Sequence, residues 1–532
     1  MVGVASICAA LGCSPAEPAA TRNHELVEIL IQDPVEGCDP RQATHVRTSS
    51  VTRHVHEGLV AYDPTALQEG EAVLRGGLAE SWDVEDDGRR LVFHLRSGWR
   101  FHDDGCFSDW KGREVVADDV LFSVTRWVSA GTPEPRWRVF QSIRGAREYR
   151  AGSAAAVPGL RAAGPRTVTI ELERDDPFLL HALAGPAGWI VAREAVAAYG
   201  DDLSRHPVGI GPYRLARMDP AEGLTLVRHE GYGLTGSEGG ALPRNPGLRF
   251  RYGDAVDALL GTRSYDLLFA RPGRFDSLRA RMTGKGLSFA TCTKLNTIFY
   301  AFDFSLDSPW RADARLRRAL SLLLPRPTGR EDWLPAEHLL PPALLPAGAT
   351  PGDLQRQIQD PGAGLHAIEE LRAAGLAIPR VLRVRVDPNE LGVIEGWCAA
   401  FAAAGIELEC HTRESAPEGW VAHLFRDGWI ADVPDARDFY GLFWSRSPHN
   451  LSGFADARFD AAFESALAAR EASELAASYR RMEEILADEV PALWYRHERT
   501  ELIFREGLDG WAFALNPLMR PMLEYVSLEG SS

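Results

Sequence analysis

Residues 78–126 combine a hairpin pattern with an amphipathic helix, and this order constrains the fold more than any other segment. Acidic residues and a glycine at 83–88 separate two runs with strand character, as in a β-hairpin. Apolar side chains at 91, 93 and 95 alternate with 92, 94 and 96, so one face of the second strand is apolar. Asp118 and Asp119 then begin a helix, where acidic residues suit the positive end of the helix dipole.

The chain is too long for one hydrophobic core. With 532 residues, two or three folding units are expected. Its 45% hydrophobic and 25% charged residues are typical of globular proteins and exclude wholesale disorder. No segment approaches the ~20 apolar residues that span a bilayer. The formal net charge of −16 argues against nucleic acid or an anionic membrane surface as a partner, since both require basic patches. It is compatible with a soluble secreted receptor.

Alternating elements in the second half predict an α/β lobe. Residues 367–374 and 396–404 have helical character, and residues 381–386 and 406–410 have strand character. Two further helices are expected between 455 and 488, where apolar side chains recur with the helical period.

Several ordered blocks resemble one protein family. Together with residues 78–126, they resemble the family 5 extracellular solute-binding proteins, the peptide- and nickel-binding receptors of ABC transporters. The further blocks are Pro40, 57–63, 207–215, 296–303 and 491–495. Together they cover roughly residues 25 to 528.

This resemblance implies an α/β, two-lobed, periplasmic-binding-protein-like fold (class II, cluster C type) with a hinge and a ligand cleft between the lobes. Lobe one would comprise residues 24–295, with an inserted subdomain at about 61–190. Lobe two would comprise residues 296–500, and residues 501–532 would form a tail that returns to lobe one.

The first residues predict export. Ala10-Leu11-Gly12-Cys13 resembles a lipoprotein signal, so residues 1–23 would be a leader and tether, with Cys13 lipidated. The protein would then be periplasmic or extracytoplasmic, anchored to the membrane by lipid. Five cysteines follow, which allow at most two disulfides and one free thiol; these are Cys38, Cys106, Cys292, Cys398 and Cys410. Some relatives have a disulfide at the residue after the cleft Trp, but that residue is Ile430 here.

The candidate ligand site is the segment Arg426 to Asp432, which follows an apolar run at 421–425 expected to be a strand. The carboxyl ends of strands are where α/β lobes place ligand contacts. In peptide-binding members of the family, an Asp and a Trp spaced like Asp432 and Trp429 line the cleft, and the Asp accepts the peptide's α-ammonium group. Arg426 matches an Arg that can meet a carboxylate. The alternatives are that Asp432 caps a turn and that Trp429 belongs to the core.

Other constellations are less specific. His54 and His56 on a strand would share one face and could contact a metal or haem, but no third ligand is in reach, and an ordinary structural role is the alternative. His102 lies beside an insertion at 103–113 that we interpret as a polar loop. The chain has no nucleophile elbow, zinc-protease motif or Walker loop. We therefore predict no catalytic residue, no metal and no cofactor.

These observations predict a monomeric substrate-binding protein that delivers short peptides or similar solutes to the permease subunits of an ABC importer. The same fold could instead bind a nickel chelate, haem or an oligosaccharide. A secreted hydrolase that uses the clustered carboxylates of the 430s is a further alternative, as is a transcriptional regulator. The latter needs a basic helix-turn-helix at the start, which these residues lack.

Overall fold

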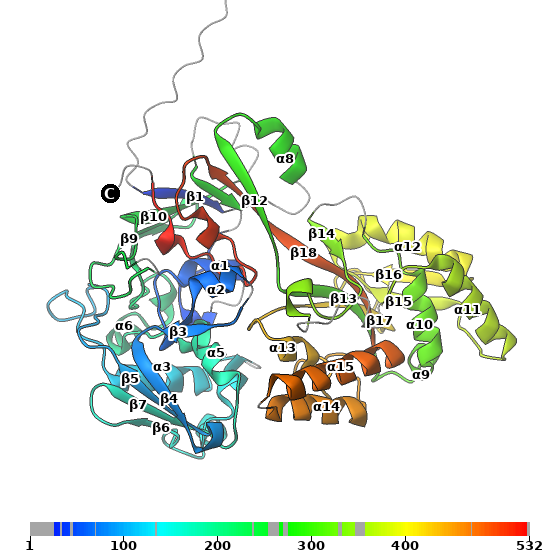
Figure 1. The fold of residues 1–532 in the computed structure, drawn as a ribbon, viewed down its shortest axis with the longest axis horizontal. Coiled ribbons are helices and arrows are strands. Elements are labelled where there is room, and N and C mark those ends of the chain that lie inside the picture. The colour runs from blue at the N-terminus through cyan, green and yellow to red at the C-terminus, as the bar shows by residue number, and fades with distance from the viewer. Residues whose placement is uncertain are drawn as a thin grey trace, which may run out of the picture.

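The chain folds into two lobes connected by long strands (Figure 1). The computed structural model describes residues 26–31, 34–42, 46–69, 71–133, 136–236, 239–253, 265–269, 275–327, 332–345, 357–469 and 471–528. We call the body that carries β1 to β12 lobe one and the body that carries β13 to β17 lobe two; β18 runs through both. The expected leader and Cys13 lie outside the described residues.

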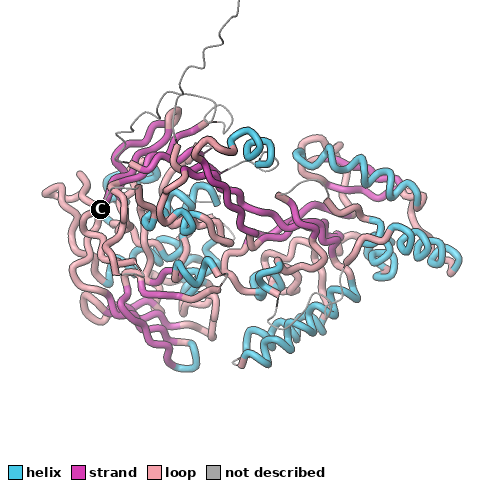
Figure 2. The backbone as a smooth tube through the Cα atoms, turned by 45° about the horizontal axis from the view of Figure 1, so that its top comes forward, coloured by secondary structure: helices cyan, strands magenta, loops and turns pink. Residues whose placement is uncertain are grey.

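One large sheet extends through both lobes, with strands in the order β16-β15-β17-β13-β18-β11-β1-β10-β9-β8, while β12 and β14 also pair with β18. Figure 2 shows these strands as a continuous band between the two bodies. The strands of this sheet are β1 (Val27–Ile31), β8 (Tyr213–Asp219), β9 (Gly223–Arg228), β10 (Gly247–Tyr252), β11 (Leu267–Phe269), β12 (Leu287–Thr293), β13 (Asn296–Phe302), β14 (Trp333–Pro335), β15 (Val381–Arg385), β16 (Glu407–His411), β17 (Leu424–Ile430) and β18 (Ala492–Arg505).

The chain crosses between the lobes at two neighbouring places. The first crossing is the step from β12 to β13, and the second is β18. The first part of β18 pairs with β13 in lobe two, and its second part, from Arg499 to Arg505, pairs with β12 in lobe one. The boundary expected near residue 500 therefore falls inside one strand. The tail enters lobe one as the second half of β18, because this strand continues across while its partner changes from β13 to β12.

The predicted hairpin and helix of residues 78–126 are confirmed. Strands β4 (Ala79–Glu85) and β5 (Arg90–Leu95) pair antiparallel, and they form a four-stranded sheet with β7 (Thr167–Glu171) and β6 (Leu160–Ala162). Helix α3 (Ala117–Val128) follows. Its buried Asp119 accepts the Val116 N–H at 3.0 Å and a bidentate pair of bonds from Arg113. The end of the 103–113 insertion thus fixes the start of α3.

The predicted alternation in lobe two is also confirmed, since β15 pairs parallel with both β16 and β17. Aspartates at the N-caps begin several helices; Asp456, for example, accepts the backbone N–H groups of Arg458 and Phe459, as N-cap residues typically do. The main helices of lobe two are α9 (Pro309–Ala312), α10 (Ala314–Leu323), α11 (Pro361–Ala373), α12 (Leu391–Ala403), α13 (Ala436–Tyr440), α14 (Ala457–Ala468) and α15 (Ala472–Glu489).

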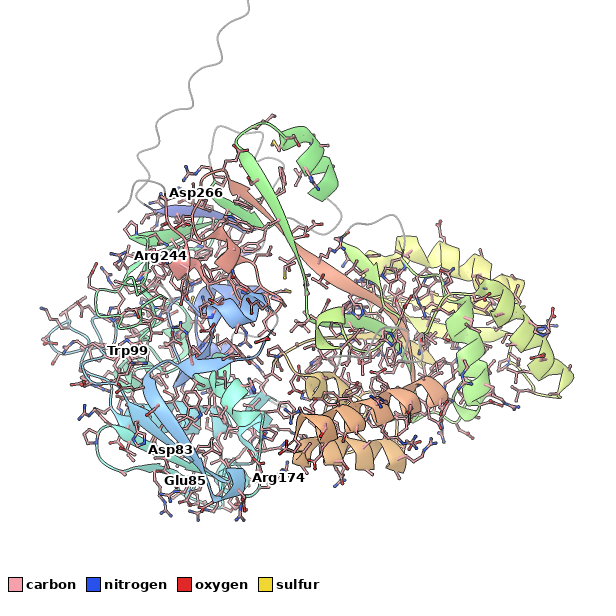
Figure 3. All side chains as sticks on the ribbon, viewed as in Figure 1. Asp83, Glu85, Trp99, Arg174, Arg244 and Asp266 are labelled. Atoms are coloured by element: carbon pink, nitrogen blue, oxygen red, sulfur yellow. The ribbon has the colours of Figure 1, made fainter. Side chains whose placement is uncertain are left out.

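Lobe one carries the remaining short elements, and charged side chains attach the returning tail to it. Asp266, labelled in Figure 3, accepts the Glu28 N–H at 2.9 Å and the Arg505 Nε at 3.0 Å, so it connects β1 to β18. The remaining elements are α1 (Val46–Thr52), β2 (Val60–Tyr62), α2 (Pro64–Gln68), β3 (Leu74–Gly76), α4 (Ala146–Arg150), α5 (Leu179–Leu183), α6 (Arg193–Tyr199) and α8 (Phe275–Met282). Within the described ranges, no helix has both the length and the apolar character needed to cross a membrane.

Candidate functional site

A cavity of about 590 Å³ lies between the lobes, within the ~300–1,000 Å³ range of small-molecule sites. Lobe one contributes Arg138, from a short 3-10 helix at 136–140. Lobe two contributes the rest of the wall. The lining residues are Arg138, Asp427, Gly428, Trp429, Leu442, Pro448, His449 and Leu451. The wall is therefore largely apolar, with one cation and one carboxyl group from opposite lobes.

Trp429 lies on this wall and also packs against a hydrophobic core that includes residues of both lobes. Its indole Nε1 donates to Asp438 Oδ2 at 2.8 Å, and its ring meets the His449 ring edge-on with centroids 5.0 Å apart. One part of the half-buried ring therefore packs on the core while another part faces the cavity.

Asp432 lies two residues beyond β17, next to the cavity but not among its lining residues. The Ala431 N–H bonds the carbonyl of Leu295, at the crossing between lobes, at 2.7 Å. The Asp432 carbonyl accepts Arg520 Nη2 of lobe one at 3.1 Å. Asp432 is exposed to solvent, and among the described residues no group donates a hydrogen bond to its carboxylate.

Desolvation opposes the ionisation of Asp432, while the nearby charges favour it. Desolvation by the surrounding protein raises the pKa of the carboxyl group, while the charges of Arg520, His449 and Arg136 act in the opposite direction. The side chain that caps the next helix is not Asp432 but Asp435, which accepts the Arg437 N–H at 2.8 Å. The alternative that Asp432 acts as a turn cap therefore has no support in the described hydrogen bonds.

Arg426 does not lie with Trp429 and Asp432 on the cavity side of β17. The expected strand at 421–425 was wrong in its bounds, since β17 begins at Leu424 and includes Arg426 and Trp429. Successive residues of a strand point to opposite faces. Arg426 accordingly lies on the far face, with its Nε 3.9 Å from the buried Glu390.

Two residues that line the cavity, Asp427 and Arg138, were not predicted as ligand contacts. Asp427 lines the cavity, and burial raises the pKa of its carboxyl group; the alternation of side chains along β17 could have identified it. Asp438 holds both the Trp429 indole and the Asp432 N–H at 2.8 Å. Burial and then the nearby Asp432 carboxylate raise the pKa of Asp438 to about 8. Arg138 carried no signal in the sequence, since it reaches the site from a distant segment of lobe one.

The predicted strand with His54 and His56 on one face was wrong. The two histidines lie in the turn after α1. His54 Nδ1 lies 3.5 Å from Glu524, and His56 Nε2 is 3.0 Å from the Cys38 carbonyl. Burial lowers the pKa of each ring to about 4. These rings connect segments of lobe one, and in the described part of the chain no group of three or more His, Cys, Asp or Glu side chains could hold a metal ion.

Comparison with known proteins places the chain in one family. It is 26% identical over 489 residues to a probable deoxycholate-binding periplasmic protein of Escherichia coli, covering 86% of this chain and 84% of the relative. It is 24% identical to a dipeptide-binding protein of Escherichia coli, covering 85% and 86%. The structure of the Escherichia coli murein tripeptide binding protein MppA superposes with a TM-score of 0.71 at 21% identity, covering 94% of this chain and 98% of the other.

These likenesses extend over both lobes, which confirms the predicted two-lobed fold. Residues 73–450 match the family described as bacterial extracellular solute-binding proteins, family 5 middle. Since that match covers more than half of the chain, the protein belongs to the family 5 bacterial extracellular solute-binding proteins.

Proposed function

We propose that this protein is the substrate-binding component of an ABC importer and that it captures short peptides between its lobes. The observation that carries the proposal is the Asp432 carboxylate, exposed beside the interlobe cavity and without a hydrogen-bond donor among the described residues. A peptide's α-ammonium group would supply that donor and an opposite charge in one step. Relatives named for peptide binding support this choice.

The cavity supplies the other contacts that a peptide needs. Trp429, Leu442 and Leu451 offer an apolar wall for a side chain. Arg138, which comes from the opposite lobe, offers a positive charge for the carboxylate of the peptide. Backbone hydrogen bonds along an extended peptide would keep the site tolerant of sequence. Arg426 has no part in this proposal, because it faces Glu390 on the other side of β17.

Closure of the lobes would accompany binding. The bond from Arg520 to the Asp432 carbonyl already joins lobe one to the segment that carries the Asp432 carboxylate. Arg437 of lobe two lies over the Phe178 ring of lobe one at 5.2 Å. A ligand held between Arg138 and Asp432 would add contacts that exist only when the lobes are close, and such contacts shift the equilibrium toward the closed form.

The hydrogen bonds of the carboxylates near Asp432 favour ligand binding over catalysis. Asp435 is occupied by Arg437 and by Tyr479, and Asp438 is occupied by the Trp429 indole. Neither Asp435 nor Asp438 is therefore free to act with Asp432 as an acid and base pair.

Calorimetric titration with the dipeptide Ala-Phe and with its N-acetylated form tests the proposal. Removing one partner of a bonded charge pair costs about 2–5 kcal/mol, so Asp432→Ala should weaken binding of Ala-Phe by roughly thirtyfold or more. The wild type should discriminate strongly against the acetylated form. Asp201→Ala, an exposed aspartate of lobe one, serves as the matched control and should bind like wild type. Equal binding of both forms by wild type, or an unaffected Asp432→Ala, would refute the role of Asp432.

An amphipathic carboxylate is a second candidate ligand. The cation of Arg138 against an apolar wall, with Arg136 and Arg520 close to Asp432, favours it, and one relative is named for deoxycholate. Titration with deoxycholate separates the candidates. Tight binding that is lost in Arg138→Gln but kept in Asp432→Ala would favour this ligand class over peptides.

We also propose export, lipid anchoring at Cys13 and a monomeric state. The Leu11-Gly12-Cys13 sequence supports the anchor. Palmitate labelling of the protein expressed in its native cells should mark wild type and leave Cys13→Ala unlabelled. An unlabelled wild type would contradict the anchor without bearing on the ligand site.

A further inference from the structure

Two cysteines meet where α12 packs on the edge of the large sheet. Cys398 lies on α12, whose Ile394, Trp397 and Phe401 are buried in the core of lobe two. Cys410 lies on β16, the edge strand, which pairs only with β15 among the described strands. Both cysteines pack against the same core cluster, so the helix and the strand present their thiols to one shared interface.

Burial and the neighbouring Cys398 thiol raise the pKa of Cys410 to about 12, and both side chains pack against one core cluster, so the two thiols are neighbours. The other described cysteines have different surroundings: Cys38 is buried beside Thr52, Cys106 is beside Asp104, and the Cys292 Sγ lies 3.6 Å from the Thr293 carbonyl oxygen. Within the part of the chain that the structure describes, Cys398 and Cys410 are therefore the neighbouring pair of thiols.

We propose that Cys398 and Cys410 form a disulfide in the mature protein. A disulfide requires its two β-carbons to lie about 3.5–4.5 Å apart, and neighbouring thiols on a helix and a strand that share one core can reach that geometry by a small movement. The chain belongs to an extracellular family, and disulfides form and persist in oxidising compartments. The pairing does not depend on the identity of the ligand.

The oxidant is a thiol–disulfide oxidoreductase in its disulfide form. The thiolate of one cysteine attacks that disulfide, and the oxidoreductase sulfur that leaves becomes a thiol after taking up a proton. The second cysteine, as its thiolate, then displaces the remaining oxidoreductase sulfur. The protein thus loses two protons and two electrons, and the oxidoreductase disulfide is reduced to two thiols.

The bond would fasten an edge strand to the helix that covers it. It would close a short loop from α12 through the turn at 404–406 to β16. Such a bond stabilises mainly by restricting the unfolded chain. The pair packs with the core that also contains Leu424, on the face of β17 opposite Trp429, so we expect ligand affinity to be the same in the oxidised and reduced forms.

Alkylation under denaturing conditions, followed by peptide mass spectrometry, tests the proposal on full-length protein isolated from an oxidising compartment. Unfolding during alkylation removes any protection that comes from burial. Cys398 and Cys410 should resist alkylation until a reductant is added, and their linked peptide should be lighter by two hydrogens than the two separate peptides. Cys292 should be alkylated without reduction.

A stability measurement provides the second readout. Reduction should lower the melting temperature of wild type and of the control Cys292→Ser, and should leave the double variant Cys398→Ser/Cys410→Ser unchanged. In Cys398→Ser, the Cys410 peptide should become available to the alkylating reagent. Full alkylation of both cysteines in unreduced wild type, even after incubation with oxidised glutathione, would overturn the proposal, as would a linkage of either one to another cysteine.

Discussion

Two carboxylates near the crossing strands, Glu498 and Asp432, have opposite surroundings. Glu498 lies on β18 and receives bonds from Lys294 Nζ at 3.1 Å, from Asn296 Nδ2 at 3.2 Å and from Arg496 Nη2 at 3.1 Å. Burial alone would raise the pKa of Glu498, but Lys294 and Arg496 outweigh it and the pKa is lowered. The pKa of Asp432 is raised, since desolvation outweighs the cations around it.

The comparison separates a structural carboxylate from one suited to a ligand. Glu498 is saturated with donors from both crossing strands, so it stabilises the connection between the lobes. Asp432 lies near the same crossing between the lobes, since the N–H of its neighbour Ala431 bonds the Leu295 carbonyl. Its carboxylate nevertheless has no hydrogen-bond donor among the described residues. A carboxylate that the protein leaves unpaired beside a cavity is available to a cationic ligand.

The largest expected effect is at Arg496. This buried side chain bonds both Glu390 and Glu498 and lies 4.0 Å from the Trp333 ring centroid. Arg496→Ala should lower the free energy of unfolding by about 3–5 kcal/mol, because two carboxylates lose their compensating charge. Urea denaturation followed by tryptophan fluorescence measures it. Arg315→Ala, which removes an exposed ion pair with Asp313, should cost less than about 1 kcal/mol. Similar losses in both variants would contradict the structural role of this cluster.

A direct test of the comparison pairs Glu498→Gln with Asp432→Asn. Glu498→Gln should destabilise the ligand-free protein by about 1–3 kcal/mol, since it weakens hydrogen bonds to a charged group. Asp432→Asn should not destabilise the ligand-free protein, because its carboxylate accepts no hydrogen bond from the described residues and its raised pKa means that ionisation is unfavourable in the folded state. The same denaturation assay compares the two. Equal losses would mean that Asp432 is as firmly built into the fold as Glu498.

A third carboxyl group tests whether a raised pKa alone identifies a ligand site. Glu483 of α15 is buried against the Tyr440 hydroxyl, 2.9 Å away, and burial raises its pKa from 4.5 to about 7. Since the folded protein favours the protonated form, this contribution to stability is complete below pH 4.5 and is lost as the pH rises through about 7.

Glu483→Gln keeps an acceptor for Tyr440 and removes this titration. It should be more stable than wild type by roughly 1–3 kcal/mol at pH 8 and about equal to it at pH 4. Ligand affinity should not change. Thermal unfolding of both proteins across this pH range measures the effect, and parallel pH profiles would argue against the raised pKa.

The smallest expected effect is in overall shape. Small-angle scattering at saturating ligand should show a reduced radius of gyration, because closure shortens the distance between the lobes. Arg520→Ala removes a bond between the lobes and should increase the radius of the ligand-free protein. Identical profiles with and without ligand would contradict hinge closure.

Local patterns predicted much of the fold. The hairpin β4–β5, the helix α3 and the α/β alternation of lobe two follow from side-chain periodicity and acidic helix starts, which depend only on neighbouring residues. The candidate segment with Trp429 and Asp432 was also identified, through its resemblance to a family. The bounds of β17 were predicted less well, because Arg426 and Asp427 are polar while the strand that contains them is central in the sheet.

The sequence alone determined the family, the α/β class and two residues beside the cavity. The tertiary structure decided which charges are paired. Arg496 finds Glu390 more than a hundred residues away, Arg138 reaches the cavity from the other lobe, and strand alternation turns Arg426 away from Trp429. Pairing depends on distances between groups far apart in the chain, and those distances exist only after the lobes have folded and the strands have crossed between them.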